Sequence, residues 1–238
     1  MKLKFIYFIA VVTILVSCIK EKETIQEVPP GIIRDTTDRV ALYEKIEDLF
    51  PENNQTAVLL PTLFTDTVLK QIVLTKETEV YITFILERAL YKNTVGWYSY
   101  TPSNKPTKVS EINMHILFPN VSGVGEGGEL LKGDMLQLGS KKFPQGTVIG
   151  FFLIVNGWNN GEIRYSNVTH YTDYNFNVGG NQQHVLFKDK VGGEFVLGFE
   201  DRLYAESDKD FNDILFIISD NKEGLETISF DLVKLPIL

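Results

Sequence analysis

Six side chains with hard oxygen atoms gather between positions 200 and 213 of the chain. They are Glu200, Asp201, Asp208, Asp210, Asn212 and Asp213. Two apolar runs, Phe195–Phe199 and Ile214–Ile218, flank this cluster and predict two buried strands joined by an acidic loop. Burial of uncompensated carboxylates is costly, so the cluster needs water, basic partners or a cation.

The alternating spacing of Asp208, Asp210 and Asn212 indicates a set of cation ligands. In a loop wrapped around an ion, this spacing turns successive oxygens inward, as in calcium loops of the D-x-D-x-[DN] type. Calcium coordinates about six to eight hard oxygens, and the other carboxylates of the cluster can complete the set with backbone carbonyls. We therefore predict a Ca²⁺ site with ligands from Glu200, Asp201, Asp208, Asp210, Asn212 and Asp213.

The loop departs from the EF-hand pattern. Asp213 occupies the sixth position, where an EF-hand has glycine, and Ser219 the twelfth, where it has glutamate. Strands rather than helices flank the loop. The prediction is therefore a calcium loop of a β-sandwich.

Two structural alternatives remain open for the same residues. Asp and Asn side chains in loops often cap turns through hydrogen bonds to the backbone. Asp201 or Asp213 can also pair with Arg202, Arg164 or Lys209, although such surface pairs contribute at most about 1 kcal/mol.

A catalytic reading needs two carboxyl groups with separated pKa values across a cleft. Glu200 as the acid and Asp213 or Asp210 as the base form such a pair, and metal-assisted hydrolysis is the version best suited to an acidic cluster. Clustered aspartates more often hold an ion than share protons. We therefore favour a binding role and keep a hydrolase acting on envelope or extracellular glycans as the alternative.

A second candidate site consists of aromatic and amide side chains at Trp97, Tyr98, Asn156 and Trp158. Exposed aromatic rings bury the apolar face of a sugar, and amides hydrogen-bond its hydroxyls. The alternative, which we favour, is that the aromatic residues fill the core and the Asn-Gly pair forms a turn.

The amino-terminal stretch predicts a lipid anchor. Lys2 and Lys4 precede an apolar run, Phe5–Val16, that is too short for a typical membrane span. Leu15–Cys18 then reads as a bacterial lipobox, which predicts a signal peptide over 1–17 and acylation of Cys18, including palmitate. We expect the protein in the cell envelope, anchored to the outer membrane. The signal does not specify whether it lies on the periplasmic face or on the cell surface. The alternatives are a plain secretory signal and an uncleaved anchor.

Composition excludes several classes of protein. The net charge is −8 and no long basic run occurs, which argues against nucleic-acid binding. The single cysteine rules out an internal disulfide. His115, His170 and His184 lack zinc-ligand spacing.

The segments before position 67 are predicted to connect the anchor to a single domain. Residues 18–36 are charged and then proline-rich, which favours a flexible tether. Residues 37–66 form a helical or extended lead-in, with a helix over Asp38–Phe50 that Asp38 caps and Pro51 ends.

From residue 67 to 238 the pattern predicts strands separated by turn residues. The expected strands are Val68–Thr75, Val80–Leu86, Glu111–Phe118, Thr147–Val155, His184–Phe187, Glu194–Phe199, Phe211–Ile218 and Thr227–Leu235. Thr147–Val155 is nearly continuously apolar and is predicted to be buried on both faces. The fold class is all-β: an antiparallel two-sheet β-sandwich, jelly-roll-like, with a short N-terminal helix.

Several stretches within residues 79–220 carry a family resemblance. They are Ala89–Asn93, Gly96–Tyr100, Phe118–Asn120, Gly127–Leu130, Gly133-Asp134, Leu138-Gly139, Gly146-Thr147, Asn156–Trp158, Gly198–Asp201 and Asp208–Asp213. In order and spacing, they resemble the LruC-type domain of unknown function (family 4114) of bacterial envelope proteins. The resemblance implies a lipoprotein of the Bacteroidetes, and the family's acidic residues, which have suggested an enzyme, fall on the six residues of the acidic loop.

Together these features predict a lipid-anchored envelope protein that binds calcium and serves as a ligand-binding or adhesion module. The expected partners are the membrane, through Cys18, and a glycan or another envelope protein.

Overall fold

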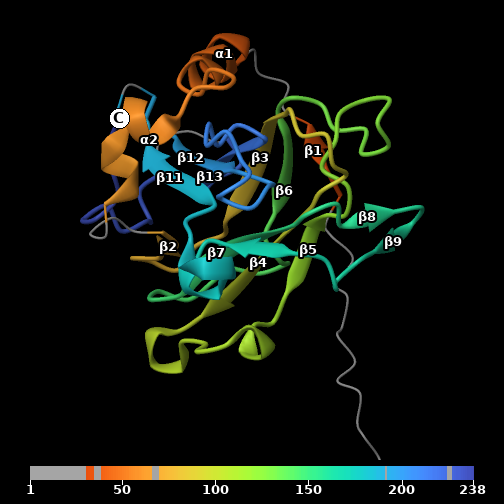
Figure 1. Cartoon of the computed structure of the whole chain (residues 1–238). Coiled ribbons are helices and arrows are strands. Elements are labelled where there is room, and N and C mark those ends of the chain that lie inside the picture. Colours follow the sequence, from red (N-terminus) through yellow and green to blue (C-terminus); the bar gives the residue numbers. More distant parts are fainter. Residues whose placement is uncertain (1–30, 35–38, 66–69, 191, 224–226) are drawn as a thin grey trace, which may run out of the picture.

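The computed structural model describes residues 31–34, 39–65, 70–190, 192–223 and 227–238. Two antiparallel sheets pack face to face, and a helix lies outside one of them (Figure 1). The predicted all-β sandwich with a short N-terminal helix is confirmed. Cys18, Asp38 and the predicted signal peptide lie outside the described residues.

The six-stranded sheet draws its strands from distant parts of the chain. In spatial order they are β1 (Ile33–Arg34), β6 (Asp134–Gln137), β3 (Tyr81–Glu87), β13 (Ile214–Ser219), β12 (Phe195–Phe199) and β11 (His184–Lys188). β13 therefore lies between β3 and β12, and the acidic loop joins the adjacent strands β12 and β13.

The five-stranded sheet faces it. Its order is β10 (Thr169–Tyr171), β7 (Val148–Ile154), β4 (Thr94–Tyr100) and β5 (His115–Phe118), and β2 (Ile72–Val73) pairs with the other end of β7. A small hairpin, β8 (Trp158–Asn159) and β9 (Glu162–Ile163), projects beyond this sheet (Figure 1).

Helical segments are short. They comprise α1 (Val40–Asp48), α2 (Thr56–Leu59) and the 3₁₀ turns Pro61–Phe64, Pro102–Asn104, Val109–Glu111, Tyr174–Phe176 and Val178–Gly180. None of the helices in the described ranges has the length and apolar character needed to cross a bilayer.

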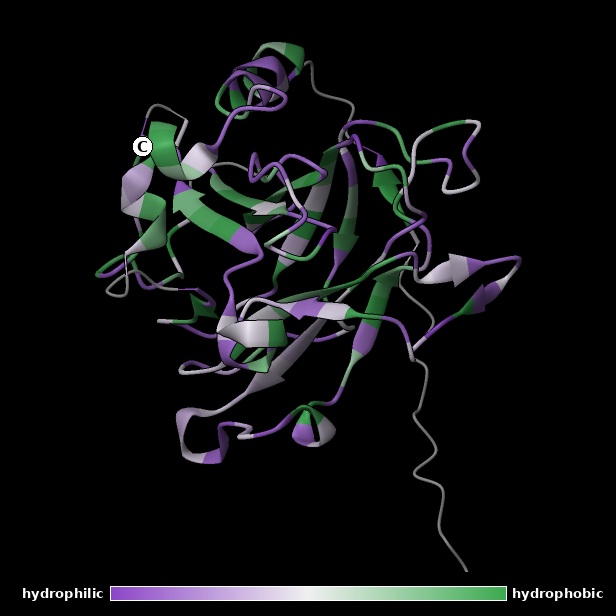
Figure 2. Ribbon diagram, in the orientation of Figure 1, coloured by the Kyte–Doolittle hydropathy of each residue, from purple (hydrophilic) through white to green (hydrophobic). Residues whose placement is uncertain are grey.

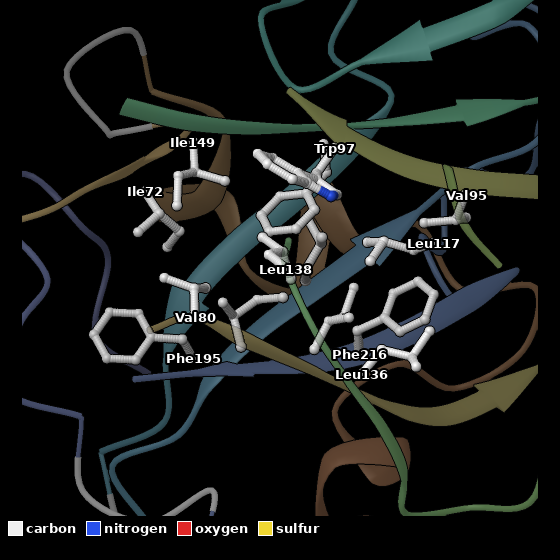
Figure 3. Close-up of a cluster of buried hydrophobic side chains, with 14 of the residues drawn as sticks. Ile72, Val80, Val95, Trp97, Leu117, Leu136, Leu138, Ile149, Phe195 and Phe216 are labelled. Atoms are coloured by element: carbon white, nitrogen blue, oxygen red, sulfur yellow. The ribbon is translucent and has the colours of Figure 1, made fainter. Parts of the chain in front are cut away.

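The main core lies between the two sheets because side chains alternate along each strand. On β7, Ile149 and Phe151 face this core, whereas Phe152 packs on the outer face of the five-stranded sheet. Figure 3 shows Trp97 and Ile149 projecting from one sheet toward Phe195 of the other. Every residue of β7 is buried, as predicted for Thr147–Val155.

A second core lies between α1 and the outer face of the six-stranded sheet. Tyr43 and Ile46 of α1 pack in one cluster with Leu215 and Ile217 of β13. Figure 2 shows hydrophobic and hydrophilic residues side by side on α1, as an amphipathic helix requires. Because both faces of β13 are covered by apolar side chains, its sequence is an uninterrupted apolar run up to Ser219.

Several predicted elements differ from the observed ones. Thr227–Leu235 makes only an isolated bridge, between Leu74 and Phe230, and Glu111–Phe118 is extended only over β5. β4, β6 and β10 were not predicted. Ile33 and Arg34, within the predicted tether, pair with β6.

Candidate functional site

The acidic loop, Glu200–Asp213, forms one wall of a cavity at the end of the six-stranded sheet. The cavity has a volume of about 460 Å³. Its lining residues are Glu52, Asn53, Arg88, Leu90, Tyr91, Glu200, Asp201, Arg202, Glu206, Ser207, Asp208 and Asp213. We call this the acidic cavity, because six carboxyl groups face two guanidinium groups in its wall.

Glu200 is the most deeply placed carboxyl group of the acidic cavity, with 1% of the residue exposed. Its Oε1 accepts a hydrogen bond from the Phe211 amide at 2.7 Å. Its Oε2 is buried and has no hydrogen-bond partner among the described residues. Burial raises the pKa of Glu200 to about 7, although the Phe211 amide and the nearby Ser207 hydroxyl act to lower it. An unsatisfied buried carboxylate oxygen of this kind is a ready ligand for a cation.

Asp201 and Asp213 are neighbours on the cavity wall. The Asp201 amide donates to Asp213 Oδ2 at 2.7 Å, and Asn93 Nδ2 donates to Asp201 Oδ2 at 2.9 Å. Burial, together with the charge of Asp201, raises the pKa of Asp213, and burial also raises that of Asp201. When two carboxyl groups lie so close together, the negative charge of one disfavours ionisation of the other. A nearby cation would favour the ionised form of both.

Asp208 and Asp210 meet Glu52, which lies between α1 and α2. One carboxylate oxygen from each of these three residues lies within 4.8 Å of the others. Glu52 and Asp208 are exposed, whereas Asp210 is buried. We call this set the carboxylate trio. The sequence predicted Asp208 and Asp210 as ligands but gave no signal for Glu52.

Asp210 also holds the backbone around it. Its Oδ2 accepts from the Asn53 amide at 2.8 Å and its Oδ1 from the Asn212 amide at 3.3 Å. Burial raises the pKa of Asp210 to about 6, with these two amides opposing the shift. The turn-capping alternative therefore applies to Asp210, and it leaves the carboxylate oxygens within reach of the other two members of the trio.

The backbone of the acidic loop is held in an uncommon conformation at Lys209 and Phe211, whose φ angles are 65° and 57°. Phe211 turns its ring inward against Phe64, with ring centroids 5.1 Å apart. Its carbonyl oxygen passes over Gly198 of β12, where a Cβ atom would lie only 2.5 Å from it. Glycine at position 198 therefore lets the loop fold back across its own strand.

The segment after α1 is fastened to the loop by backbone contacts. The Thr56 amide donates to the Lys209 carbonyl at 2.8 Å, and Thr56 Oγ1 donates to the Asp210 carbonyl at 2.6 Å. Asn212 Nδ2 donates to the Phe50 carbonyl at 3.0 Å. Asn212 is thus buried beneath the loop and is not part of the cavity lining, although the sequence predicted it as a ligand.

Groups behind the acidic loop support its first residues. His170 Nε2 lies 3.3 Å from the Asp201 carbonyl, and Gln183 Nε2 donates to the Arg202 carbonyl. The Gln183 carbonyl accepts from the Glu200 amide at 3.0 Å. Burial lowers the pKa of His170 to about 4, so the ring is neutral near pH 7 and donates from Nε2.

Arg88 is the basic group closest to the trio. Its guanidinium nitrogens lie 3.7 Å from Glu47 Oε2 and 3.9 Å from Glu52 Oε2. Lys209, an alternative partner in the sequence analysis, lies over the Tyr204 ring at 4.6 Å. Arg88 therefore offsets part of the negative charge at Glu52 without reaching the buried oxygen of Glu200.

The geometry of the trio suits a calcium ion. Ca–O distances are about 2.3–2.6 Å, so oxygens on opposite sides of one ion lie about 4.6–5.2 Å apart. The three oxygens of the trio fall within that range or closer. Hard carboxylate ligands favour calcium over zinc, which prefers nitrogen and sulfur.

The aromatic candidate site is divided by the fold. Trp97 and Tyr98 are consecutive residues of β4 and face opposite sides of the sheet, and both are buried. Trp158 is half-buried and lines a separate apolar hollow of about 380 Å³ with Asn120 and Leu117, whereas Asn156 is exposed in a turn. Trp97 and Tyr98 therefore fill cores, and only Trp158 and Asn156 remain accessible.

The histidines do not meet. His115 stacks on Trp97 at a centroid distance of 4.4 Å, and His184 is fully buried in β11. Within the described part of the chain, the carboxylate trio is the group of acidic, histidine or cysteine side chains whose geometry fits a metal ion.

One family comparison gives a match. Residues 143–221 match the family described as Domain of unknown function (DUF4114). The match includes β12, the acidic loop and β13 but stops short of Glu52 and Asn93, which lie earlier in the chain. No curated protein and no solved structure matches the chain.

Proposed function

We propose that this chain, part of which matches a domain family of unknown function, is a lipid-anchored, calcium-binding protein of the cell envelope. In this proposal, calcium occupies the acidic cavity and stabilises the loop between β12 and β13. The folded domain then serves as a ligand-binding or adhesion module, and the chemistry of the cavity is binding rather than turnover.

The observation that carries the calcium proposal is the unpartnered Oε2 of Glu200 in a wall of carboxyl groups. Burial raises the pKa of Glu200 and that of Asp210, so the ionised forms of both carboxyl groups are poorly solvated in the fold. A divalent cation supplies the missing positive charge and converts its binding free energy into folding stability.

The test is thermal unfolding of the purified full-length protein in EGTA and in millimolar calcium. We expect calcium to raise Tm by several degrees, because each kcal/mol of binding corresponds to about 2–4 °C in a chain of this size. Magnesium at the same ionic strength is the control, since it requires a smaller octahedral site. An unchanged Tm, or equal shifts with both ions, would contradict a calcium site.

The anchor proposal rests on the lipobox at Leu15–Cys18 and the short apolar run before it. We expect the mature protein to carry acyl chains at Cys18 and to partition into detergent. Cys18→Ser should remove both the added mass and the partitioning. A wild-type protein that carries no acyl mass would end this part of the proposal.

A glycan is the partner we propose for the module, at the hollow beside Trp158. This half-buried ring lines an apolar hollow with Leu117 and Phe118, which provides a stacking surface for the apolar face of a sugar. Calorimetric titration with neutral oligosaccharides tests it, with Trp158→Ala as the matched variant. Binding that survives this substitution would place the partner elsewhere.

A hydrolase acting on envelope or extracellular glycans remains the alternative. Burial raises the pKa of Glu200 to about 7 inside the acidic cavity, which suits a general acid. Asp213 is the candidate base, but burial and the charge of Asp201 raise its pKa to about 8, so this role requires a nearby cation that lowers the Asp213 pKa. This reading requires turnover that Glu200→Gln abolishes while the fold is kept. Absence of turnover on envelope glycans would leave the binding role.

A further inference from the structure

We infer that the cation site is shared between two distant parts of the chain, and that Glu52 supplies a ligand that locks the α1–α2 segment onto the acidic loop. This inference rests on the proposed calcium binding and goes beyond it by naming the ligand set and what the ion controls. The ligands are Glu52, Asp208 and Asp210, and Glu200 lines the same cavity as Glu52 and Asp208.

The first step is the position of Glu52. Its carboxylate stands with those of Asp208 and Asp210 inside 4.8 Å, and it lines the same cavity as Glu200. Its side chain is 55% exposed, so the fold does not depend on its burial. Three carboxylates in such proximity repel one another. A cation bound between them attracts each one and outweighs this repulsion.

The second step is the independent observation at Glu200. This residue is 99% buried, and its Oε2 has no hydrogen-bond partner in the described part of the chain. It lines the cavity that Glu52 and Asp208 of the trio also line. A hard cation in this cavity would bring positive charge near a buried carboxyl group that lacks a hydrogen bond at Oε2.

The third step is the set of hydrogen bonds that already joins the α1–α2 connection to the acidic loop. Asn53 and Thr56 hydrogen-bond to Asp210 and Lys209, so the backbone on both sides of Glu52 moves with the loop. An ion held by Glu52 and Asp208 adds a bond between the exposed side chains of the same two segments. The α1–α2 segment, packed on the outer face of the six-stranded sheet, is then fastened in a calcium-dependent manner.

The experiment compares Glu52→Gln with Glu206→Gln in the full-length protein. Both substitutions remove one negative charge from the wall of the acidic cavity, but Glu206 is outside the trio. Calcium affinity is measured by calorimetry. We expect Glu52→Gln to weaken binding by about tenfold or more, and Glu206→Gln by less than about threefold, since only the first removes a ligand.

The second readout is amide hydrogen exchange with and without calcium. In the wild type, calcium should slow exchange in residues 50–56 more than in residues 101–113, an exposed connection by the other sheet that reports local opening away from the acidic cavity. This extra protection should vanish in Glu52→Gln and persist in Glu206→Gln.

The outcomes separate this inference from the proposed function. If the wild type binds calcium but the two variants bind it equally, or residues 50–56 gain no extra protection, the shared site is wrong and calcium binding stands. If the wild type binds no calcium, both fall. Selective loss in Glu52→Gln establishes the shared site.

Discussion

The side-chain amide of Asn212 donates a hydrogen bond to the carbonyl oxygen of Phe50, joining residues 162 positions apart at a distance of 3.0 Å. Both residues are buried. Phe50 is the residue that follows the C-cap of α1, Leu49. Asn212 therefore fastens the segment just after α1 to the far end of the acidic loop.

Asn212→Ala should destabilise the fold to a similar extent with and without calcium. The substitution leaves the buried Phe50 carbonyl with only a long hydrogen bond of 3.4 Å from Arg88 Nη1, at a cost of about 1 kcal/mol. Chemical denaturation in EGTA and in calcium measures both values. A loss seen only in calcium would instead make Asn212 a ligand, as the sequence first suggested.

Asp208→Asn should behave in the opposite way. Asp208 is exposed and belongs to the carboxylate trio, so its replacement should change stability in EGTA by less than about 0.5 kcal/mol. The stabilisation by calcium should fall markedly, because one charged ligand is lost. The same denaturation series measures it, and an undiminished calcium effect would remove Asp208 from the site.

Arg88→Gln should tighten calcium binding. The guanidinium lies 3.9 Å from Glu52 and competes with a cation for that carboxylate. Removing one positive charge near the site should increase affinity several-fold at low salt, and the gain should shrink as ionic strength rises. Calorimetry at two salt concentrations tests the prediction. Weaker binding in the variant would show that Arg88 positions the ligands instead.

Phe216→Ala should be among the most damaging single changes. The Phe216 ring is fully buried on β13, stacks on Phe118 at 5.8 Å and meets the edge of Phe84 at 6.2 Å. Truncation leaves a cavity between the sheets and should cost about 3–5 kcal/mol. Urea denaturation gives the value, with the surface change Leu90→Ala, at an 88% exposed position, as the control.

Stability should fall in acid partly through His184. Burial, with the charge of Lys70 adding to it, lowers the pKa of His184 to about 3, well below the value of about 6.5 in an unfolded chain. Below pH 6.5, His184 binds a proton in the unfolded state but stays neutral in the folded state. The stabilisation is therefore complete above pH 6.5 and is lost as the pH falls toward 3, by up to about 1.4 kcal/mol per pH unit.

His184→Gln isolates that effect. Glutamine can still donate to the Lys70 carbonyl, which His184 Nε2 approaches at 3.1 Å, but it does not titrate. Between pH 6.5 and 4.5 the unfolding free energy of the variant should therefore fall less steeply than that of the wild type. His170 stays in both proteins and serves as the internal control. Parallel pH profiles would rule out His184 as the source.

The strands flanking the acidic loop could be predicted because burial on both faces leaves a plain apolar run. Ile214–Ile218 and Phe195–Phe199 are examples, and the cavity-facing position of Glu200 follows from the end of β12. β4 was not predicted, because Thr94, Gly96 and Ser99 interrupt its apolar pattern, although its aromatic residues, Trp97 and Tyr98 among them, favour a strand. Consecutive strand residues face opposite sides, which separates the two rings.

Glu52 could not be predicted from local pattern. It is one acidic residue in an exposed connection, and its meeting with Asp208 depends on α1 docking on the outer face of the six-stranded sheet. Thr227–Leu235 shows the opposite error, a predicted strand that the fold does not form. Its alternation favours a strand, but only Phe230 forms a bridge, because residues 73–75 supply the sole extended partner in the described ranges.

The placement of β13 has a consequence for how the chain reaches its fold. β13 fills the gap between β3 and β12, so a growing or truncated chain that stops before Ile214 leaves two apolar strands with open edges. Such edges readily pair with other chains. Closing the sheet requires residues 81–87 to pair with residues 214–219, which lie more than 120 positions later in the chain. We therefore expect sheet formation to be slow and to depend on the arrival of β13.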